Sequence, residues 1–309
     1  MELIRGLHNI GTHHHGCVLT IGKFDGVHLG HQAVLKSVLQ KAEELNLPAV
    51  VMVFEPQPEE LFSAERAPAR LSLLKDKYIA LRDIGVHRLL CVRFTRDFSA
   101  ISPQSFIHDL LIKQLGVKFL VVGDDFRFGY KREGDFDMLR DASETAGFDV
   151  VSTQSFKVHD CRISSTAVRT ALSQGDFEGA KEMLGGAYVI RGKVVHGEKN
   201  GRTIGYPTAN VLMRRHKSPV KGVFAGLVKT KTGIYNAVIN VGNRPTLNGQ
   251  RMQLEAHLFD FDGDLYGQNV EVELLKKIRD EIKFPDFQVL KQQINKDATQ
   301  ARSLLANFE

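Results

Sequence analysis

The chain has 309 residues, which is more than one hydrophobic core usually supports, so we expect two domains. Its apolar fraction of 43% is ordinary for a globular protein, and 41 basic against 36 acidic residues give a formal net charge of +5. The basic residues are dispersed, which suits phosphorylated small molecules and argues against a nucleic-acid partner. The three cysteines lack metal-ligand spacing or close pairing, which argues against a zinc site and a disulfide framework.

The N-terminal region contains neither a targeting signal nor a strong metal motif. Met1–Ile10 lacks the long apolar core of a signal peptide, and no apolar run in the chain approaches membrane-spanning length. We therefore expect a soluble, cytoplasmic protein with no membrane partner. His13, His14 and His15 could hold a metal ion, but an exposed polar loop is favoured because no carboxylate or cysteine joins them at ligand spacing.

The first half of the chain alternates short apolar runs with longer amphipathic stretches. We predict strands at 17–22, 49–54, 89–94, 119–123 and 148–152, and helices at 32–46, 72–84, 103–115 and 135–146. This alternation is typical of an α/β fold with a doubly wound parallel sheet, which binds nucleotides at the carboxyl ends of its strands.

The second half has a different pattern. After a predicted helix near 165–184, β-prone runs follow at 187–195, 222–229, 234–241, 253–260 and 269–275, separated by turns rich in glycine, proline and asparagine. The absence of helical patterns between them predicts an antiparallel sheet or small barrel, on which a last helix at about 286–307 would dock. We place the domain boundary at 185, giving domains 1–185 and 186–309.

A glycine turn at residues 22–32 lies between the first predicted strand and the first predicted helix. Backbone amides and the positive end of a helix favour an anion at such a turn, and His28 and His31, one helical turn apart, could both face it. The alternative is an ordinary strand-to-helix turn with two surface histidines. The candidate nucleotide-binding residues of this turn are Gly22, Phe24, Asp25, Gly26 and Gly30.

Two later segments would join this turn at the same edge of the sheet. One follows the strand at 119–123 and contains Asp124, Asp125, Phe126 and Arg127. The other is a helix start at 162–169, in which hydroxyl groups and amides precede a basic side chain; its candidate residues are Ser164, Ser165, Thr166 and Arg169. A plain helix cap is the alternative interpretation of this second segment.

The second half contains a glycine-rich segment at 196–210 and a later acidic strand. Gly197, Gly201 and Gly205 permit close approach to a polyphosphate, although the segment is not a Walker A loop. Thr208 and Asn210 offer hard oxygen ligands for magnesium. Alternation along 254–259 places Glu255 on the polar face, where it could act as a general base; a solvated strand face is the alternative.

The motifs of the first half resemble the nucleotidyltransferase superfamily, and in particular the FMN adenylyltransferase half of the bifunctional bacterial riboflavin kinase/FAD synthetase family. The resemblance implies attack of the ionised FMN phosphate on the α-phosphorus of ATP, with His28, His31 and Arg169 stabilising the charge. Lys23 stands where asparagine is common in the family, and Gln57 where many members have histidine. Asp124 and Asp125 also replace asparagine of some members, which leaves the magnesium or flavin contact there open.

The segments at 201–210, 255–267 and 278–284 resemble the riboflavin kinase domain in the same order. The resemblance implies a Rossmann-like domain followed by a six-stranded Greek-key barrel. It also implies that Thr208 and Asn210 hold Mg²⁺ and that Glu255 deprotonates the ribityl 5′-hydroxyl. A loop over ATP would contain Gly192, Gly197, Gly201, Gly205 and Pro207, and Arg279 with the loop after it would close over flavin.

The expected function is therefore ATP-dependent synthesis of FMN from riboflavin and of FAD from FMN. Two alternatives stay open. Only one half could be active, or the chain could be a non-catalytic nucleotide- or RNA-binding relic of the fold. The intact set of His28, His31 and Arg169, together with Thr208, Asn210 and Glu255, favours the enzyme.

Overall fold

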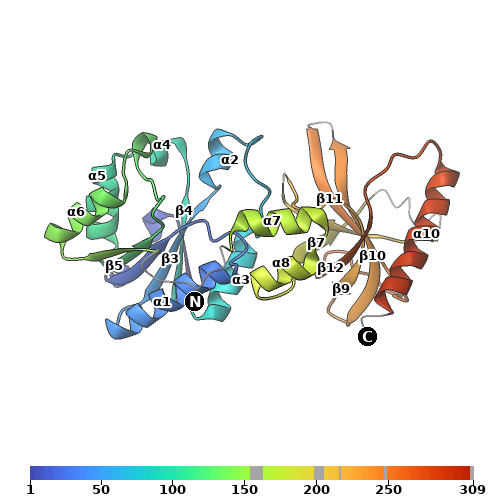
Figure 1. Ribbon diagram of the computed structural model, residues 1–309, viewed down its shortest axis with the longest axis horizontal. Helices are drawn as coiled ribbons and strands as arrows, with labels where there is room; N and C mark the ends of the chain where they lie inside the picture. The colour runs from blue at the N-terminus through green and yellow to red at the C-terminus, as the bar shows by residue number, and fades with distance from the viewer. Residues whose placement is uncertain (154–162, 198–204, 216, 247–248, 307–309) are drawn as a thin grey trace. The chain divides into compact units, whose positions relative to one another are not determined.

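The computed structural model describes residues 1–153, 163–197, 205–215, 217–246 and 249–306 (Figure 1). The chain divides into two compact units. The first contains Met1–Pro68 and Ser72–Ser164, and the second contains Ala69–Leu71 and Ser165–Glu309. The chain thus passes finally into the second unit at 164/165, whereas the sequence predicted a boundary at 185.

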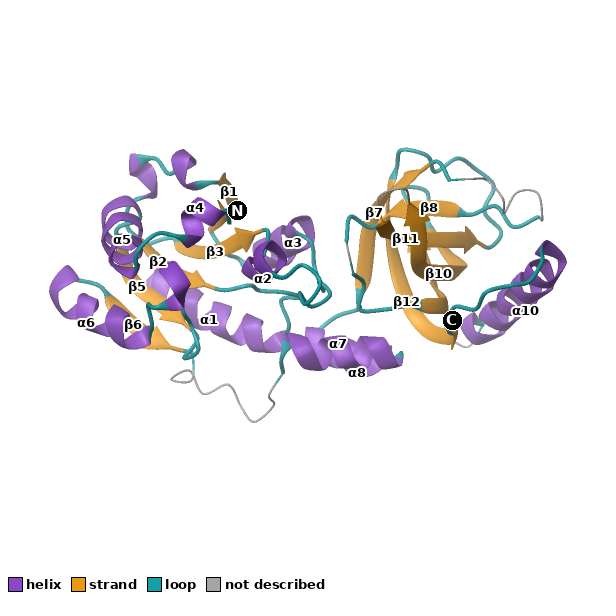
Figure 2. Cartoon of the chain, turned by 90° about the horizontal axis from the view of Figure 1, so that it is seen from above, coloured by secondary structure: helices purple, strands orange, loops and turns teal. Residues whose placement is uncertain are grey.

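The first unit is built on a sheet of six parallel strands in the order β1-β4-β3-β2-β5-β6 (Figure 2). The strands are β1 (Glu2–Arg5), β2 (Cys17–Ile21), β3 (Ala49–Glu55), β4 (Arg88–Arg93), β5 (Val117–Val122) and β6 (Asp149–Ser152). The helices are α1 (Leu29–Glu44), α2 (Pro58–Phe62), α3 (Leu74–Ile84), α4 (Arg96–Ser99), α5 (Pro103–Ser105) and α6 (Phe136–Ala146), with a π-helical segment η3 (Phe106–Gln114) continuing α5 and short 3₁₀ turns η1 (Leu7–Asn9), η2 (Thr12–His14) and η4 (Tyr130–Arg132). The parallel α/β architecture predicted from the sequence is confirmed.

Helices cover both faces of this sheet because its central strands are apolar on both sides. Along β3, Val50 and Met52 pack into the cluster that contains η3, whereas Val51 and Val53 pack with Leu35 of α1. Burial of both faces is typical of parallel sheets with crossover helices. The core therefore holds the strand ends rigidly, and the edge at their carboxyl ends is left for loops.

The strand order places the topological switch point between β2 and β5. From β2 the chain builds the sheet outward through β3 and β4, and it then returns to add β5 and β6 on the other side. The register pairs Thr20 with Val121, so the two strands end side by side. Ligands of open α/β sheets bind at such a point. The predicted turn at 22–32 and the segment at 123–129 follow these two strands.

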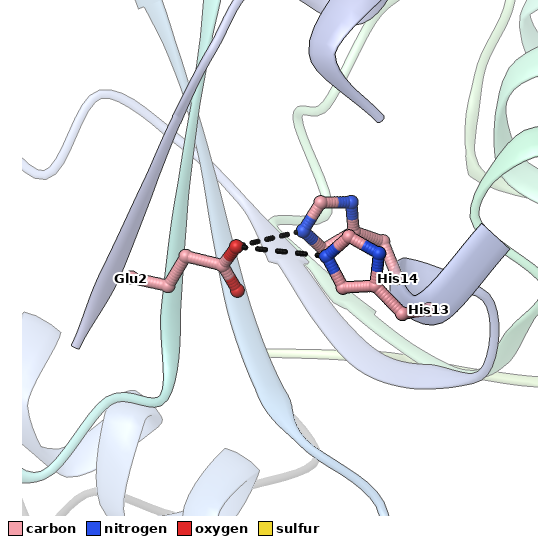
Figure 3. Close-up of side chains that lie close together, drawn as sticks. All are labelled: Glu2, His13 and His14. Atoms are coloured by element: carbon pink, nitrogen blue, oxygen red, sulfur yellow. Dashed lines mark hydrogen bonds and ion pairs between the residues drawn. The ribbon is translucent and has the colours of Figure 1, made fainter. Parts of the chain in front are cut away.

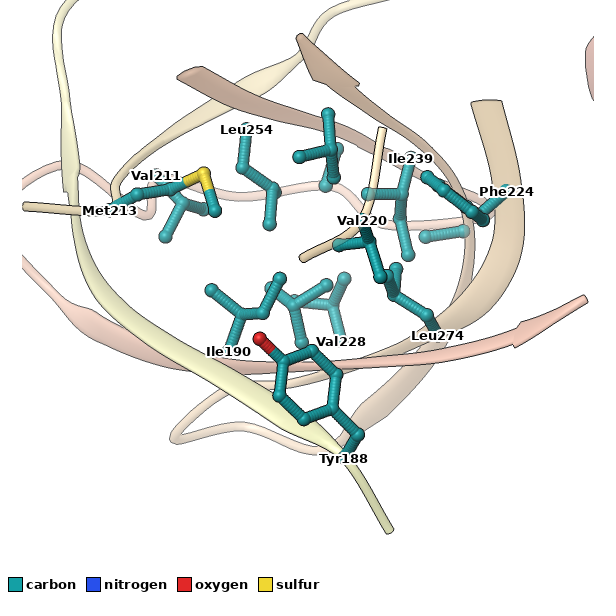
Figure 4. Packing of buried hydrophobic residues seen from close by; sticks show 14 of the residues in the cluster. Tyr188, Ile190, Val211, Met213, Val220, Phe224, Val228, Ile239, Leu254 and Leu274 are labelled. Carbon is teal, nitrogen blue, oxygen red and sulfur yellow. The ribbon is translucent and has the colours of Figure 1, made fainter. Parts of the chain in front are cut away.

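The second unit is a closed barrel with the strand order β10-β11-β8-β7-β12-β9, and every neighbouring pair is antiparallel. Its elements are α7 (Ser165–Gln174), α8 (Phe177–Leu184), β7 (Val189–Val195), β8 (Ala209–Leu212), β9 (Gly222–Lys229), β10 (Ile234–Thr246), β11 (Gly249–Leu258), β12 (Asn269–Arg279) and α10 (Phe287–Leu305). Aliphatic and aromatic side chains from the strands fill the interior (Figure 4). The predicted six-stranded barrel is confirmed.

Helices α7 and α8 belong to the barrel core, which explains the shifted boundary. Val168, Leu172 and Phe177 are buried in one cluster with barrel residues. The predicted single helix at 165–184 is broken at Gly175, which adopts φ 79°, and α8 restarts where Asp176 accepts a hydrogen bond from the amide of residue 179. A left-handed glycine ends a helix because it lacks Cβ strain.

A short stretch of the first half, residues 69–71, also packs in the second unit. Leu71 is buried in the barrel cluster, and Arg215 Nη1 donates to Arg70 O at 3.2 Å and to the Tyr188 hydroxyl at 2.6 Å. Arg169 Nε donates to Ala69 O at 2.6 Å. These contacts depend on tertiary packing, so no local pattern predicts them. Among the described helices, none combines the length and apolar character that crossing a membrane requires.

Candidate functional site

The glycine turn after β2 has unusual backbone angles and is stabilised by hydrogen bonds between buried groups. Phe24 and Val27 adopt φ values of 45° and 43°, on either side of Gly26 at 84°. Non-glycine residues with such angles cost about 1–3 kcal/mol each and concentrate at functional sites. Asp25 is buried, and its Oδ1 accepts hydrogen bonds from the Ser72 amide (2.9 Å) and hydroxyl (3.2 Å).

The same serine also holds the next residue of the turn. The Gly26 amide donates to Ser72 Oγ at 2.9 Å. Asp25 and Gly26 were predicted to bind nucleotide, but the structure engages their polar groups with Ser72. Phe24 is buried in the core cluster below the turn. All three residues therefore shape the turn from within, and any contact with nucleotide remains a prediction.

His28 and His31 lie together at the start of α1. His28 is the N-cap residue, and its Nδ1 accepts a hydrogen bond from the His31 amide at 3.3 Å. Their rings stack with centroids 3.7 Å apart and an interplanar angle of 18°, and the Phe24 ring lies 5.1 Å from that of His31. Because Nδ1 of His28 accepts, the proton of its neutral ring lies on Nε2, which can donate to an anion.

His31 is held in its neutral form. Burial lowers its pKa well below the ordinary value, and the neighbouring His28 and Lys77 lower the pKa further. Its Nδ1 is buried, and no hydrogen-bond partner for this atom is found in the part of the chain that the structure describes. His28 and His31 thus lie together beside the switch point, and their contact with phosphate remains a prediction.

At Gly22 and Gly30, the other two glycines of the turn, a side chain would lie unusually close to neighbouring atoms. A Cβ on Gly22 would lie 3.1 Å from the Phe24 ring, and one on Gly30 would lie 3.1 Å from Ile163 O and 3.2 Å from His28 Nδ1. Gly30 thus lets the backbone before α7 approach the histidines. This proximity brings the first and third predicted segments together at residues 163–164. Ser164 and Thr166 are exposed, and Ser165 begins α7.

Arg169 lies one turn further along α7. Its Nε is engaged with Ala69 O within the second unit, as described above. The contact of Arg169 with phosphate therefore stays a prediction.

The segment after β5 presents charged side chains at the carboxyl edge of the sheet. Asp124, Asp125 and Arg127 are exposed, while the Phe126 ring stacks on that of Phe128 with centroids 5.5 Å apart. Ser152 Oγ donates to Asp124 Oδ1, which ties the segment to β6. Exposed carboxylates here suit Mg²⁺, which prefers one or two carboxylates together with phosphate oxygens.

An aromatic group at this edge was missed by the sequence reasoning. Phe54, Phe62, Phe94 and Phe98 form a cluster in which the Phe62 and Phe94 rings meet edge to face, with centroids 6.0 Å apart. Phe62 on α2 is 61% exposed. Lys23 of the turn forms an ion pair with Glu59 of the same helix. The signal was the set of phenylalanines at the end of β3, just after β4 and on the short helices α2 and α4 that follow these strands.

Glu2, His13 and His14 form a cluster with the spacing of a metal site at the opposite edge of the sheet (Figure 3). Glu2 Oε1 lies 2.9 Å from His14 Nε2 and 3.8 Å from His13 Nε2, while Arg88 Nε contacts Glu2 Oε2 at 3.1 Å. The Gly11 amide donates to His14 Nδ1 at 2.8 Å.

This arrangement is better explained as a structural contact between β1 and η2 than as a set of metal ligands. Since Nδ1 of His14 accepts a hydrogen bond, the proton of the neutral ring lies on Nε2, where a cation would have to bind. Arg88 adds a positive charge at the carboxylate of Glu2. The hydrogen bond from His14 is the main cause of the lowered pKa of Glu2. The cluster ties β1 to η2, and the sequence reasoning missed its carboxylate because Glu2 lies on a strand that was not predicted.

The barrel places two predicted residues directly opposite each other. Glu255 of β11 pairs with Asn210 of β8 in the sheet register. Gln253 joins them, because its Nε2 donates to Glu255 Oε1 at 2.8 Å and also to Asn210 Oδ1. A Cβ on Gly197 would collide with the buried Asn210 side chain, so the backbone at 197 passes closely over this group.

A cavity of about 250 Å³ opens in the barrel near these residues. Pro207 and Thr208 line it, and the His257 ring nitrogen Nδ1 lies 2.8 Å from Pro207 O. Its other lining residues are Val194, Ala209, Leu258, Phe261, Asp262, Gly263, Asp264, Leu265 and Tyr266. The lining combines apolar side chains with the polar groups of Thr208, Asp262, Asp264 and Tyr266, which can orient a small molecule.

Two predicted binding residues, Gly192 and Arg279, have structural contacts in the second unit, and the contact of Arg279 with flavin remains a prediction. Gly192 lies within β7, not in a loop, and its Cβ would lie 2.5 Å from Val211 Cγ1 and 2.7 Å from Leu212 O. The loop over ATP therefore cannot begin at Gly192, because that residue is part of the barrel wall. Arg279 forms an ion pair with the buried Asp297 of α10 (Nη2 to Oδ2, 2.7 Å).

Two further glycines complete the predicted loop. Gly205 is exposed and adopts φ 84°, a conformation that favours glycine. Gly201 lies outside the described residues, so its predicted contact with ATP is not tested.

Comparisons with known proteins agree with the division into two activities. The family model described as FAD synthetase matches residues 10–167, and the model described as riboflavin kinase matches 184–305. Proteins named bifunctional riboflavin kinase/FMN adenylyltransferase are similar over nearly their whole length. The one from Haemophilus influenzae is 52% identical over 98% of this chain and 99% of its own, and the one from Escherichia coli strain K12 is 53% identical over 98% and 97%.

A solved structure has the same fold. The crystal structure of a macrolide-efflux protein from Streptococcus pneumoniae is 32% identical, with a TM-score of 0.76, over 98% of this chain and 99% of that one. Both matched regions, and the fold of nearly the whole chain, are therefore shared with full-length relatives. The chain belongs to the bifunctional riboflavin kinase/FMN adenylyltransferase family.

Proposed function

We propose that the chain makes FAD from riboflavin in two ATP-dependent steps. The barrel transfers the γ-phosphoryl group of ATP to the 5′-hydroxyl of riboflavin and releases ADP. The parallel-sheet unit then joins the phosphate of FMN to the α-phosphorus of a second ATP and releases pyrophosphate. The observation that carries this proposal is the presence of one suitable set of side chains in each unit, with His28 and His31 stacked in one and Glu255 opposite Asn210 in the other.

Adenylyl transfer requires alignment and charge stabilisation more than a base. The FMN phosphate is already ionised at neutral pH, so its oxygen needs no deprotonation. His28 and His31 would donate to the ATP phosphates, together with Ser164, Ser165, Thr166 and Arg169. The exposed Phe62 ring offers the flavin a stacking surface.

Transfer of the γ-phosphoryl group requires a base, because the ribityl hydroxyl is neutral. Glu255 would accept its proton, and Gln253 orients the carboxylate through the 2.8 Å hydrogen bond. The backbone loop that contains Gly197, Gly205 and Pro207 would cover ATP. Arg279 of β12 is held by its ion pair with Asp297 of α10, and from this position it would contact the flavin.

Magnesium fits the residues of both units. In the barrel, the Asn210 side chain and the Thr208 hydroxyl offer hard oxygen atoms, and the close passage of Gly197 leaves the Asn210 amide in a tight backbone cradle. In the first unit, Asp124 and Asp125 would hold the ion. When bound, Mg²⁺ neutralises phosphate charge during transfer.

The proposed partners are riboflavin, FMN and ATP, and the proposed location is the cytoplasm. The dispersed basic residues do not favour nucleic acid as a partner. Activity of one half alone, or loss of both activities, remains the alternative to be tested.

The by-products of the two reactions provide the test. Purified protein given riboflavin and Mg-ATP should release ADP, and the same protein given FMN and Mg-ATP should release pyrophosphate without ADP. Release of only one by-product would show that one half is inactive, and release of neither would support a binding relic.

A further inference from the structure

His257 lies on β11, two residues beyond Glu255, so the two side chains project from the same face of the strand. The ring nitrogen Nδ1 of His257 lies 2.8 Å from Pro207 O. A carbonyl oxygen can only accept a hydrogen bond, so Nδ1 carries the proton and donates it. The contact thus fixes one tautomer of the ring, and it holds the backbone carbonyl that directly precedes Thr208.

This hydrogen bond lies where the backbone pairing of β11 with β8 ends. Among the described residues, the ladder of these two strands ends at the pair Ala256–Ala209. The next residue of β11 is His257, and Pro207 lies two residues before Ala209, just outside β8. Proline has no amide hydrogen, so Pro207 cannot extend the ladder as a donor. The side chain of His257 therefore holds a stretch of chain that strand pairing does not reach.

Aromatic packing keeps the ring of His257 in place. The Tyr206 ring meets it edge to face with centroids 5.0 Å apart, and the Phe259 ring does the same at 5.6 Å. Phe259 is buried in a cluster with residues of α10, and Tyr206 packs against that cluster. The Arg302 guanidinium lies 4.2 Å from the centroid of the Phe259 ring. A ring fixed in this way can hold the Pro207 carbonyl in one position.

The residue that depends most on this hydrogen bond is Thr208. It is half-buried and lines the barrel cavity, and it is one of the two proposed magnesium ligands of the barrel. The other, Asn210, is held within β8 by strand pairing and by Gln253. Thr208 precedes the strand, so the peptide that His257 holds determines where its hydroxyl lies. Loss of such a support behind a metal ligand typically lowers metal affinity by about 10–100-fold.

We propose that His257 is a positioning residue for riboflavin phosphorylation, whose hydrogen bond from Nδ1 to the Pro207 carbonyl keeps Thr208 in place to bind Mg²⁺ together with Asn210. This inference rests on the proposed magnesium site of the barrel. The histidine acts through the backbone of Pro207 and not by contact with the metal or the substrate.

The test compares two polar replacements of the same side chain. In His257→Asn the amide nitrogen can take the place of Nδ1 and donate to Pro207 O, whereas in His257→Gln the amide extends to the place of Nε2 and this bond is lost. In the glutamine variant we expect the Mg²⁺ concentration for half-maximal riboflavin phosphorylation to rise about 10-fold, with a nearly normal rate at saturating Mg²⁺. The asparagine variant should keep the wild-type Mg²⁺ requirement.

Hydrogen exchange of the full chain, without metal or nucleotide, gives a readout that does not depend on activity. Loss of the hydrogen bond releases the chain before β8, so peptides that cover Ala209–Leu212 should exchange faster in His257→Gln than in His257→Asn or the wild type. FAD synthesis from FMN should be unchanged in both variants. His108→Gln makes the same substitution at an exposed histidine of the first unit and should alter none of these measurements.

Several results would overturn the proposal. They are an unchanged Mg²⁺ requirement in His257→Gln, an equal rise in the asparagine and glutamine variants, a rate that stays low at saturating Mg²⁺, and unchanged exchange of β8. Loss of the cooperative unfolding transition in His257→Gln would also overturn it, because the bond would then support the whole fold.

Thr208→Ala is measured in parallel to separate this inference from the magnesium site on which it rests. An unchanged Mg²⁺ requirement in Thr208→Ala would contradict the proposed metal site itself. A rise in Thr208→Ala without a rise in His257→Gln would refute only the role of His257.

Discussion

Replacing Glu255 by glutamine tests the chemistry of the barrel while leaving its structure nearly intact. The glutamine keeps the shape of the side chain, and Gln253 Nε2 can still donate to its Oε1 atom, as it does to Glu255 at 2.8 Å. The pairing of β11 with β8 at Asn210 uses backbone groups and is unaffected. The change therefore removes the proton acceptor and little else.

The expected effects on rate and on stability differ enough to be separated. Loss of a general base lowers the rate by about 10²–10⁴-fold, which corresponds to about 3–5 kcal/mol of activation free energy. The cost to the fold is the difference between a charged and a neutral hydrogen-bond acceptor, about 1 kcal/mol. Because a folded domain has about 5–15 kcal/mol of stability, nearly all of the variant stays folded.

The assay follows riboflavin phosphorylation, FAD synthesis from added FMN, and thermal unfolding on one preparation. We expect the first rate to collapse, the second to stay normal and the unfolding temperature to change by a few degrees at most. Glu273→Gln makes the same chemical change on β12 and should leave both rates unchanged. Riboflavin phosphorylation within about 10-fold of the wild-type rate would remove Glu255 from the mechanism as its base.

Three further predictions follow from the two units. Replacing His28 and His31 together by alanine should lower FAD synthesis by about 10²–10³-fold or more with riboflavin phosphorylation intact; equal loss of both activities in steady-state assays would contradict their assignment. A fragment that begins at Ser165 should unfold cooperatively and phosphorylate riboflavin. One that begins at Ala187 should aggregate or melt at a lower temperature, because it lacks the core residues of α7 and α8. If thermal melts followed by circular dichroism showed the two fragments to be equally stable, the domain boundary would lie at 185. Burial raises the pKa of Cys17 to about 12, so iodoacetamide at pH 8 should modify it only after denaturation, as peptide mass mapping would show, and rapid labelling of the native protein would contradict the packing of β2.

Local sequence patterns predicted most of the strands and helices of this chain. The buried strands β2 to β5 are continuous apolar runs between turn residues, so the sequence determines them with little help from the rest of the fold. Strands β1 and β8 were missed, although β6, which also has four residues, was predicted.

The division by packing at 164/165 depends on where amphipathic helices pack, which no local pattern shows. The apolar face of α7 predicts that the helix is buried, but it does not indicate which core receives it. The packing of residues 69–71 in the second unit is even less predictable from sequence, since their hydrogen bonds come from side chains far away in the chain, such as Arg215.

The candidate sites were predictable where spacing along one element was sufficient. His28 and His31 lie one turn apart, and Glu255 alternates with apolar neighbours on β11. The contacts of Arg279 with Asp297 and of Asp25 with Ser72 were not predictable, because no local pattern in the sequence reveals such distant partners. The burial of Lys77 was equally unpredictable, since the sequence shows only one of two lysines on an amphipathic helix.

Isotope labelling of ATP shows whether one chain performs both transfers. The purified full chain is incubated with riboflavin and Mg-ATP labelled with ³²P at either the γ- or the α-phosphate, and the flavins are separated by chromatography. We expect γ-label to appear in FMN and then in FAD, and α-label to appear in FAD alone. Labelled FMN without labelled FAD, α-label in FMN, or no labelled flavin would contradict it.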